Sequence, residues 1–456
     1  MKVSQRPQFI NKKDKIEFKL CKSGGKIMKR THKATLLSTL FMGLGQLYNR
    51  DFLKGIVFMI IEAIALINIP GISHGIWGLV TLGDTPQQFV GGKIVQNDHS
   101  IFLLTEGLIV AVLLAAFALI YIYNIKDAKR TAEKLEKGGK VLKPLEYINF
   151  VWTYFFPQIM MTPAVIAITF FIFLPILITM AIAFTNYSIP HHVPPRNLVD
   201  WVGINNFIKI FKLDIWNNTF VQVGLWTIIW AIASTFLNYF TGLGLALLTN
   251  AKGIKFRKMW RTIFLLPYAI PGFISLLIFR LAFSGTGPIN AFIQSMGLAK
   301  IPFFTDPTLA KLMVIVINMW LGSPYFMVLM AGVLTNIPQS MYEAANIDGA
   351  NKWKQFINIT LPMVFYQTLP LLIMTFAYNF NNFNAVYLLT DGNPINANFR
   401  YAGSTDILIT WVYKMTRDQS QFHMASVITI ILFIFVAGVS GYSLSRSKAF
   451  KEEDML

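Results

Sequence analysis

The stretch EAANIDGANKWKQFINITLP, residues 343–362, separates two apolar runs that lack charged side chains, 312–335 and 366–389. Gly349 breaks the helix that the first residues favour, and Asn351 permits a second helix to start. The second helix carries an apolar face made of Trp353, Phe356, Ile357 and Ile359. The residues alone leave two interpretations open: a helix that lies on the bilayer surface, or a helix that docks in the groove of a partner protein.

The flanking runs belong to a chain that is too apolar for a soluble globular protein, because 54% of its 456 residues are hydrophobic and 14% are charged. Two runs near the N-terminus contain one carboxylate each, 55–69 with Glu62 and 101–123 with Glu106. Six uncharged runs follow, each long enough for a membrane-spanning helix of about 20 residues: 149–195, 215–251, 262–279, 312–342, 355–390 and 419–445. We therefore expect an all-α, polytopic transmembrane bundle of about eight spans.

The distribution of lysine and arginine tests this count, because these residues collect in short cytoplasmic loops. Residues 1–33 carry eleven of them, 125–158 seven and 250–261 five, whereas the alternate loops carry one to three. Eight spans with both termini in the cytoplasm place all three basic segments inside. A ninth span at 34–48 would put the most basic segment outside, so we interpret that short run as re-entrant or interfacial. The net charge of +18 then reflects membrane topology and secondary contact with anionic lipid, and argues against nucleic acid binding.

The same pattern divides the chain into five parts: a basic cytoplasmic N-terminus (1–33), an N-terminal membrane hairpin (34–125), a cytoplasmic linker (126–149), a six-helix core (150–446) and a cytoplasmic tail (447–456). The N-terminus lacks the apolar region and cleavage site of a secretory signal peptide. The single cysteine, Cys21, excludes an internal disulfide framework and a multi-cysteine metal site.

Polar side chains line one face of the span that follows residues 343–362. Thr375, Tyr378, Asn379 and Asn382 recur at the i, i+3, i+4 and i+7 spacing that places side chains on one helical face. Amides are costly in hydrocarbon unless they are paired, so this face should meet the bundle interior or a cavity. It either forms hydrogen bonds between helices or binds an uncharged, hydroxyl-rich ligand, because asparagine both donates and accepts and a tyrosine ring offers an apolar face. This combination favours a carbohydrate.

Ion-coupled transporters usually carry ionisable side chains near the bilayer midplane. The six core runs contain no aspartate, glutamate, lysine or arginine, and His423 lies at the outer edge of the last run. We expect Glu62 to pair with Glu106 or Lys54 rather than to relay protons. The composition of the core thus favours a source of energy outside the membrane.

The stretch 343–362 resembles the EAA loop of ABC importer permeases, in which Glu-Ala-Ala is followed at fixed distances by Gly, Ile and Leu-Pro. The matching residues are Glu343, Ala344, Ala345, Gly349, Ile359, Leu361 and Pro362. The resemblance implies a type I ABC importer permease fold and a loop seated in a cleft of an ATP-hydrolysing subunit. The chain contains no GxxxxGK[ST] phosphate-binding loop. ATP and magnesium should therefore be bound by that partner, with no cofactor, metal or catalytic residue in this chain.

The segment from about 255 to 446, with the strings LLPY, NMWLGSPY and FAYNFNNF, resembles the larger permease of maltose and maltodextrin ABC importers, the MalF type. In that family one sugar is held midway across the membrane. The contact residues carried over by motif are Tyr268, Leu321, Gly322, Tyr325, Thr375, Tyr378, Asn379 and Asn382. Thr375 and Tyr378 stand where the best-known members have Ser and Phe, which leaves the exact sugar open.

The first outer loop of the core, 186–218, lacks the large insertion of the best-known members, and GLGQLYNRDFLKG, 43–55, resembles the Gram-positive form of the family. The resemblance implies a multi-pass permease of the bacterial cell membrane that works by alternating access and is not an enzyme. Its partners would be a second homologous permease, an ATPase dimer and an extracellular, lipid-anchored sugar-binding protein. We expect maltodextrin-type oligosaccharides as substrates. The alternatives are another oligosaccharide, such as a galacto-oligosaccharide, and a sugar facilitator or symporter that works alone.

Overall fold

The computed structural model describes residues 30–95, 97–192, 197–251 and 253–446, with side chains as far as Tyr442. Most of the basic N-terminus, Cys21 and the tail 447–456 lie outside the described residues. The chain forms two compact units. Unit 1 comprises Met1–His74 and Val110–Val165, and unit 2 comprises Gly75–Ile109 and Ile166–Leu456.

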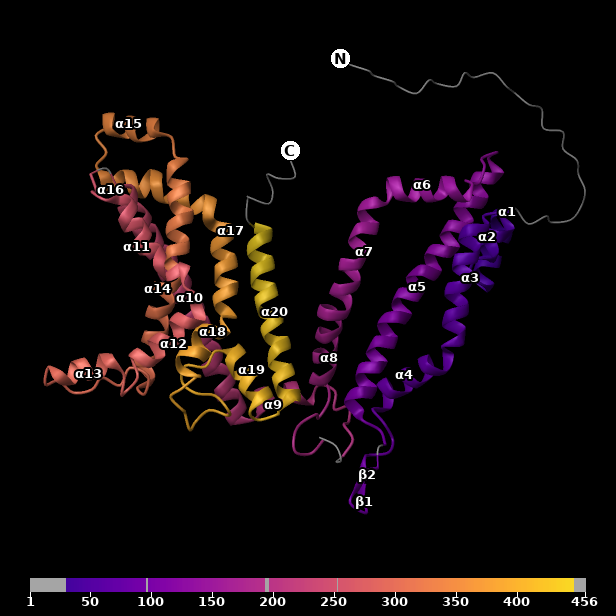
Figure 1. Ribbon diagram of the computed structural model, residues 1–456, viewed down its shortest axis with the longest axis horizontal. Coiled ribbons are helices and arrows are strands. Elements are labelled where there is room, and N and C mark those ends of the chain that lie inside the picture. Colours follow the sequence, from indigo (N-terminus) through magenta and orange to yellow (C-terminus); the bar gives the residue numbers. More distant parts are fainter. Residues whose placement is uncertain (1–29, 96, 193–196, 252, 447–456) are drawn as a thin grey trace, which may run out of the picture. The chain divides into compact units, whose positions relative to one another are not determined.

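The described residues of unit 1 form four helices that lie wholly within it: α1 (Arg30–Leu40), α2 (Leu44–Tyr48), α3 (Phe52–Ile67) and α6 (Pro144–Tyr154). Three helices have residues in both units: α4 (Ile69–Thr81), α5 (Ser100–Glu136) and α7 (Phe156–Ile168). Unit 2 holds the remaining elements, which are drawn in Figure 1: β1 (Gln88–Val90), β2 (Lys93–Val95), η1 (Thr169–Phe173), α8 (Leu174–Ala183), α9 (Asn205–Lys212), α10 (Asp214–Asn250), α11 (Arg257–Ala269), α12 (Gly272–Ala282), α13 (Pro288–Ser295), α14 (Pro307–Thr335), α15 (Gln339–Ile347), α16 (Lys352–Gln355), η2 (Phe356–Thr360), α17 (Leu361–Phe380), α18 (Phe383–Thr390), α19 (Leu408–Arg417) and α20 (Phe422–Arg446).

The predicted eight-span bundle agrees with the helices of the described chain. Six continuous helical segments are long and apolar enough to cross a membrane: Ser100–Glu136, Phe156–Ala183, Asp214–Asn250, Pro307–Thr335, Lys352–Thr390 and Phe422–Tyr442. Two bent pairs, α3 with α4 and α11 with α12, raise the count to eight if each pair is one span. The chain is therefore a multi-pass, all-α membrane protein.

The run 262–279 differs from a straight spanning helix, because it is broken by a bend of 89° between α11 and α12. Ile270 adopts an extended conformation with ψ 134°, as expected for a residue that precedes proline. Pro271 then becomes the N-cap of α12. The bend lies beside a cavity among the helices of unit 2.

Residues 34–48 do not form one continuous helix. α1 ends at Leu40, α2 begins at Leu44, and Gly43 between them has φ 85°. A Cβ atom at Gly43 would collide with the carbonyl oxygen of Gly55, so this chain crossing requires glycine. The break is consistent with a run too short to span the membrane.

The polar residues of unit 1 pair differently from our expectation. Lys54 forms ion pairs with Asp127 at 2.8 Å and Asp51 at 3.5 Å, rather than with Glu62. The buried Glu62 carboxylate instead accepts a hydrogen bond from the backbone N–H of Met42. The sequence pattern pointed to Lys54 because it is near Glu62 in the chain, whereas the fold brings Asp127 of α5 closer.

α5 continues through the predicted boundary at residue 125 and ends at Glu136, so the apolar span and the first part of the linker form one helix. Gly138, with φ 81°, follows the end of this helix. α6 then runs across the end of unit 1 toward α7 (Figure 1). The five-part division of the chain remains a prediction.

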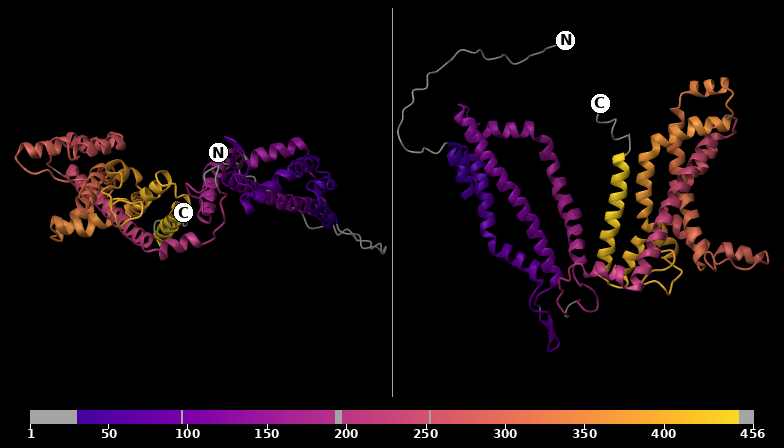
Figure 2. Two further views of the ribbon diagram at one scale, coloured as in Figure 1. Left: turned by 90° about the horizontal axis from the view of Figure 1, so that it is seen from below. Right: turned by 180° about the vertical axis from the view of Figure 1, so that it is seen from behind.

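The short helices of unit 2 lie in two groups, one at each end of the unit. α15 and α16 lie at one end, whereas α9, α18 and α19 lie at the other (Figures 1 and 2). A buried carboxylate, Asp406, holds the second end together: it accepts from Lys414 Nζ and Thr410 Oγ1, each at 2.8 Å, and from the Gly403 N–H at 2.7 Å. Burial raises the pKa of Asp406 above its ordinary value, although Lys414 acts in the opposite direction.

Candidate functional site

A cavity of about 790 Å³ lies among α10, α11, α12, α14, α17 and α18. The break between α11 and α12 contributes Tyr268 from one side and Gly272, Phe273 and Leu276 from the other. The lining, all of it in the described part of the chain, contains no aspartate, glutamate, lysine, arginine or histidine. A neutral ligand of several rings fits the size and the chemistry of this cavity.

All eight residues predicted as sugar contacts line this one cavity: Tyr268 from α11, Leu321, Gly322 and Tyr325 from α14, Thr375, Tyr378 and Asn379 from α17, and Asn382 at the N-cap of α18. Residues more than 100 positions apart in the sequence thus meet at one place. Whether each of them touches a sugar remains a prediction.

The two predicted asparagines also join helices to one another. Asn379 is 1% exposed, and its Nδ2 donates to Thr235 Oγ1 of α10 at 3.0 Å. Asn382 Nδ2 donates to Asn318 Oδ1 of α14 at 3.3 Å, while its Oδ1 accepts from the Ala385 N–H at 3.2 Å. Both interpretations of the polar face therefore describe part of what these amides do: they connect α17 and α18 with other helices, and they line a cavity.

Aromatic rings supply the apolar faces of the cavity. The rings of Tyr268 and Tyr325 are stacked, with centroids 6.3 Å apart. Tyr378 is 66% exposed and faces the same space. Flat rings next to amides form the kind of surface that binds the two faces and the hydroxyl edge of a sugar.

Three further asparagines line the cavity but were not predicted: Asn238, Asn318 and Asn384. Asn318 had a signal in the sequence, because it lies three residues before Leu321 and shares a helical face with Leu321, Gly322 and Tyr325. Its Nδ2 is buried and has no hydrogen-bond partner among the described residues. Asn238 lies on a helix for which no motif was recognised, so only the fold reveals it.

The predicted docking stretch forms a helix, a turn and a second helix. α15 holds Glu343, Ala344 and Ala345, and Gly349 follows with φ 72°. Asn351 caps α16 by accepting from the Lys354 N–H at 2.8 Å. Across the turn, Gln355 Nε2 donates to Asn346 Oδ1 at 2.6 Å and to the Ala350 carbonyl oxygen at 3.0 Å, and Tyr342 and Thr360 share a hydrogen bond of 2.9 Å. These bonds fix α15 to the start of the next span.

The structure separates the seven predicted docking residues into two groups. Glu343, Ala344 and Gly349 are exposed at the end of unit 2, and Ala345 beside them on α15 is half-buried. Ile359 and Leu361 instead pack against a buried cluster that contains Tyr239 and Val364, and Pro362 lies in the first turn of α17. Ile359 and Leu361 thus anchor the loop to the transmembrane core, whereas Glu343, Ala344 and Gly349 remain exposed.

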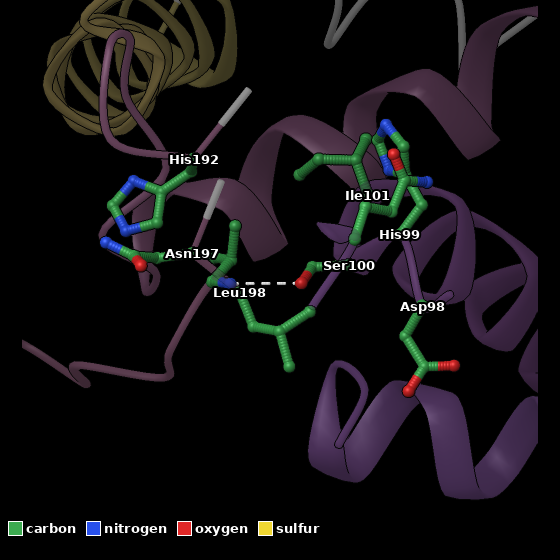
Figure 3. A pocket seen from close by; sticks show the side chains of 9 residues that line it. Asp98, His99, Ser100, Ile101, His192, Asn197 and Leu198 are labelled. Atoms are coloured by element: carbon green, nitrogen blue, oxygen red, sulfur yellow. Dashed lines mark hydrogen bonds between the residues drawn. The ribbon is translucent and has the colours of Figure 1, made fainter. Parts of the chain in front are cut away.

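A second, small hollow lies where the N-terminal end of α5 meets the loop before α9 (Figure 3). The Val199 N–H donates to Ser100 Oγ at 3.0 Å and joins these segments. Its volume of about 10 Å³ leaves room for little more than one water molecule. Among the described residues no group of three or more His, Cys, Asp or Glu side chains is arranged for a metal ion.

Comparison with known proteins gives one consistent pattern. A family model described as "binding-protein-dependent transport system inner membrane component" matches residues 238–447. The chain is 38% identical over 426 residues to the galactooligosaccharides transport system permease protein GanP of Bacillus subtilis, an alignment that covers 92% of this chain and 99% of GanP. It is also 38% identical over 435 residues to the maltodextrin transport system permease protein MalC of Streptococcus pneumoniae, covering 93% of this chain and 97% of MalC.

A similar fold occurs in the crystal structure of a bacterial ABC transporter involved in the import of the acidic polysaccharide alginate. The TM-score is 0.55 at 20% sequence identity, and the match covers 66% of this chain and 98% of that chain. At this identity the likeness concerns the fold alone.

Proposed function

This chain belongs to the family of binding-protein-dependent transport system inner membrane components, the MalF-type ABC importer permeases, and from this premise we propose that it moves maltodextrin-type oligosaccharides across the cell membrane. The observation that carries the proposal is the meeting of all eight predicted contact residues in one uncharged cavity. A sugar would bind there and change sides as the surrounding helices rock around it.

The choice of sugar rests on two relatives with different printed substrates at the same identity, a maltodextrin permease and a galactooligosaccharide permease. Tyrosine rings and neutral amides suit either sugar, so a galacto-oligosaccharide is the second candidate. We favour maltodextrin because the contact residues in LLPY, LGSPY and TFAYNFNN match the MalF-type motifs at every position except Thr375 and Tyr378.

Competition for uptake tests this choice. We expect ATP-dependent import of labelled maltotriose by proteoliposomes that contain the whole transporter and its binding protein. Unlabelled maltotetraose should compete at a concentration at least tenfold lower than galactotriose. The reverse order would identify galacto-oligosaccharides as the preferred substrates. Uptake that persists without ATP but stops on addition of a proton ionophore would support a symporter that works alone.

We further propose that the importer contains a second homologous permease, two ATPase subunits that bind ATP and magnesium, and an extracellular, lipid-anchored sugar-binding protein. The exposed residues of α15 and the turn at Gly349 would dock on an ATPase. The basic segments would then lie in the cytoplasm with both termini, close to anionic lipid headgroups.

Photo-crosslinking tests the docking proposal. Asn351 is unsuitable for the crosslinking side chain, because it caps α16. Ile347 is 88% exposed at the end of α15, and a photoreactive residue there should capture a Walker-motif ATPase in native membranes. Ile395 is a matched control, since it is 85% exposed and lies in the loop between α18 and α19. Capture of lipid alone from position 347, with the ATPase present, would contradict docking.

A further inference from the structure

Asn238 lies on α10 at the place where this helix is fastened to α17. Its neighbour Thr235 accepts from Asn379 Nδ2 at 3.0 Å, and Tyr239 shares a hydrogen bond of 2.9 Å with Thr368. These two bonds, one on each side of Asn238 in the sequence, fix the backbone of α10 against α17. The Asn238 side chain itself faces α14.

The amide of Asn238 packs directly on Gly322 of α14. A Cβ atom at position 322 would lie 2.4 Å from Asn238 Nδ2 and 2.7 Å from its Cγ, so a larger residue there would displace the amide. One turn further along α10, Gly242 packs in the same way against Ser323 and Phe326. Small residues alone therefore suffice for the close contact of these helices, and packing does not explain why an amide stands at 238.

The hydrogen bonding of Asn238 is incomplete. The side chain lines the cavity, is 4% exposed, and its Oδ1 has no partner among the described residues. A buried amide oxygen without a partner destabilises a protein, and more so in a membrane. The NH₂ groups of Asn379 and Asn382 are in contrast already bonded to Thr235 and Asn318. Asn238 thus offers the cavity an amide with unused bonding capacity.

We infer that Asn238 is a further sugar-binding residue, whose side-chain amide forms a hydrogen bond with one hydroxyl group of the transported oligosaccharide. The inference rests on the proposed function and names one contact of its site on α10. A hydroxyl group can accept from the amide NH₂ or donate to the amide oxygen, whereas a cation would require carboxylates that the lining does not contain. Gly322 is then a positioning residue, because it gives the Asn238 amide its place beside the cavity.

The test compares import by the wild type and by Asn238→Ala, each with a parent sugar and its analogues. The measurements use proteoliposomes that contain the whole transporter and its binding protein. The probe is the trisaccharide that the wild type imports, maltotriose or galactotriose, together with its series of monodeoxy analogues. The wild type should import one analogue about three- to tenfold less efficiently than the parent sugar, as expected for one lost neutral hydrogen bond. In Asn238→Ala this difference should disappear, whereas any difference that the wild type shows between the parent sugar and another analogue should persist. The binding protein is the same in all measurements, so its own preference cancels.

Ser234→Ala is the matched control. Ser234 lies one turn away on α10 and is buried with an unpaired Oγ, yet it does not line the cavity. Its variant should keep the full discrimination of the wild type. If Asn238→Ala also keeps the full discrimination against every analogue, the inference is overturned while the proposed function stands. If the wild type imports neither trisaccharide, both fail.

A measurement on the wild type avoids the risk that Asn238→Ala does not assemble. A structure of the sugar-bound transporter should place a sugar oxygen within about 3.2 Å of the Asn238 amide. A sugar bound in the cavity with no oxygen within 4 Å of this amide would overturn the inference.

Discussion

Replacement of Asn379 by alanine is expected to lower sugar import at least tenfold while the subunits still assemble. The substitution removes two things at once: the bond of 3.0 Å from Nδ2 to Thr235 and an amide that lines the cavity. Loss of one buried neutral hydrogen bond costs about 1 kcal/mol of stability. A neighbouring bond survives, because the Trp230 Nε1 donates at 2.9 Å to the backbone carbonyl of Asn379, which alanine retains.

Two control variants separate the structural part from the sugar-binding part. Thr235→Val removes the same bond between α10 and α17 from the other side, and Thr235 does not line the cavity. Asn381→Ala removes an exposed amide that bonds within its own helix. We expect both to import sugar at nearly wild-type rates, as measured by uptake per transporter in proteoliposomes. Equal losses in Thr235→Val and Asn379→Ala would mean that Asn379 only joins helices, and normal uptake by Asn379→Ala would remove it from the site.

The second large effect concerns Gly349, the turn between α15 and α16. Its φ of 72° lies in the left-handed region, although no atom lies within 4 Å of the place where a Cβ would stand. The Gly349 N–H donates to the Asn346 carbonyl oxygen and the Ala350 N–H to that of Ala345, so the turn closes α15. Gly349→Val should therefore strain the backbone by about 1–2 kcal/mol without a steric clash. We expect the angle between α15 and α16 to change and import per ATP hydrolysed to fall about tenfold.

Gly349→Asn is the matched control, because asparagine adopts left-handed backbone conformations far more readily than valine. It should retain most of the coupling. The measurement is the ratio of sugar imported to phosphate released in proteoliposomes that contain the binding protein. An unchanged ratio in Gly349→Val would show that the geometry of this turn does not transmit the work of the ATPases.

Much of the architecture was predictable because a lipid bilayer restricts the length, the polarity and the flanking charges of the segments that cross it. Runs of apolar residues and the placement of lysine and arginine predicted eight spans. The described residues form six spanning helices and two bent pairs, which agrees with that number. The helix break at Pro271 has a local cause, but its angle of 89° depends on how α12 packs against α18 and α14. The expected pair of Glu62 with Lys54 was wrong, because proximity in sequence does not show that α5 brings Asp127 to 2.8 Å from Lys54.

The candidate site was predictable where residues share one helix and a motif. The polar face from Thr375 to Asn382 follows from helical periodicity, and the α11 and α14 residues were carried over from a family resemblance. Asn238 could not be predicted in either way, since its significance depends on Gly322, 84 positions later and on another helix. The unpaired oxygen that identifies it is a property of tertiary packing and has no trace in the sequence of α10.

The cavity lining has a consequence for bioenergetics. Moving one elementary charge through a membrane potential of 100 mV involves about 2.3 kcal/mol. The described lining carries no formal charge, and a neutral oligosaccharide adds none. Passage of the sugar through this cavity then carries no charge of the sugar or of the lining across the electric field. Import should proceed at the same rate in polarised and depolarised membranes, so that a cell whose membrane potential has collapsed could still feed as long as its ATP lasts.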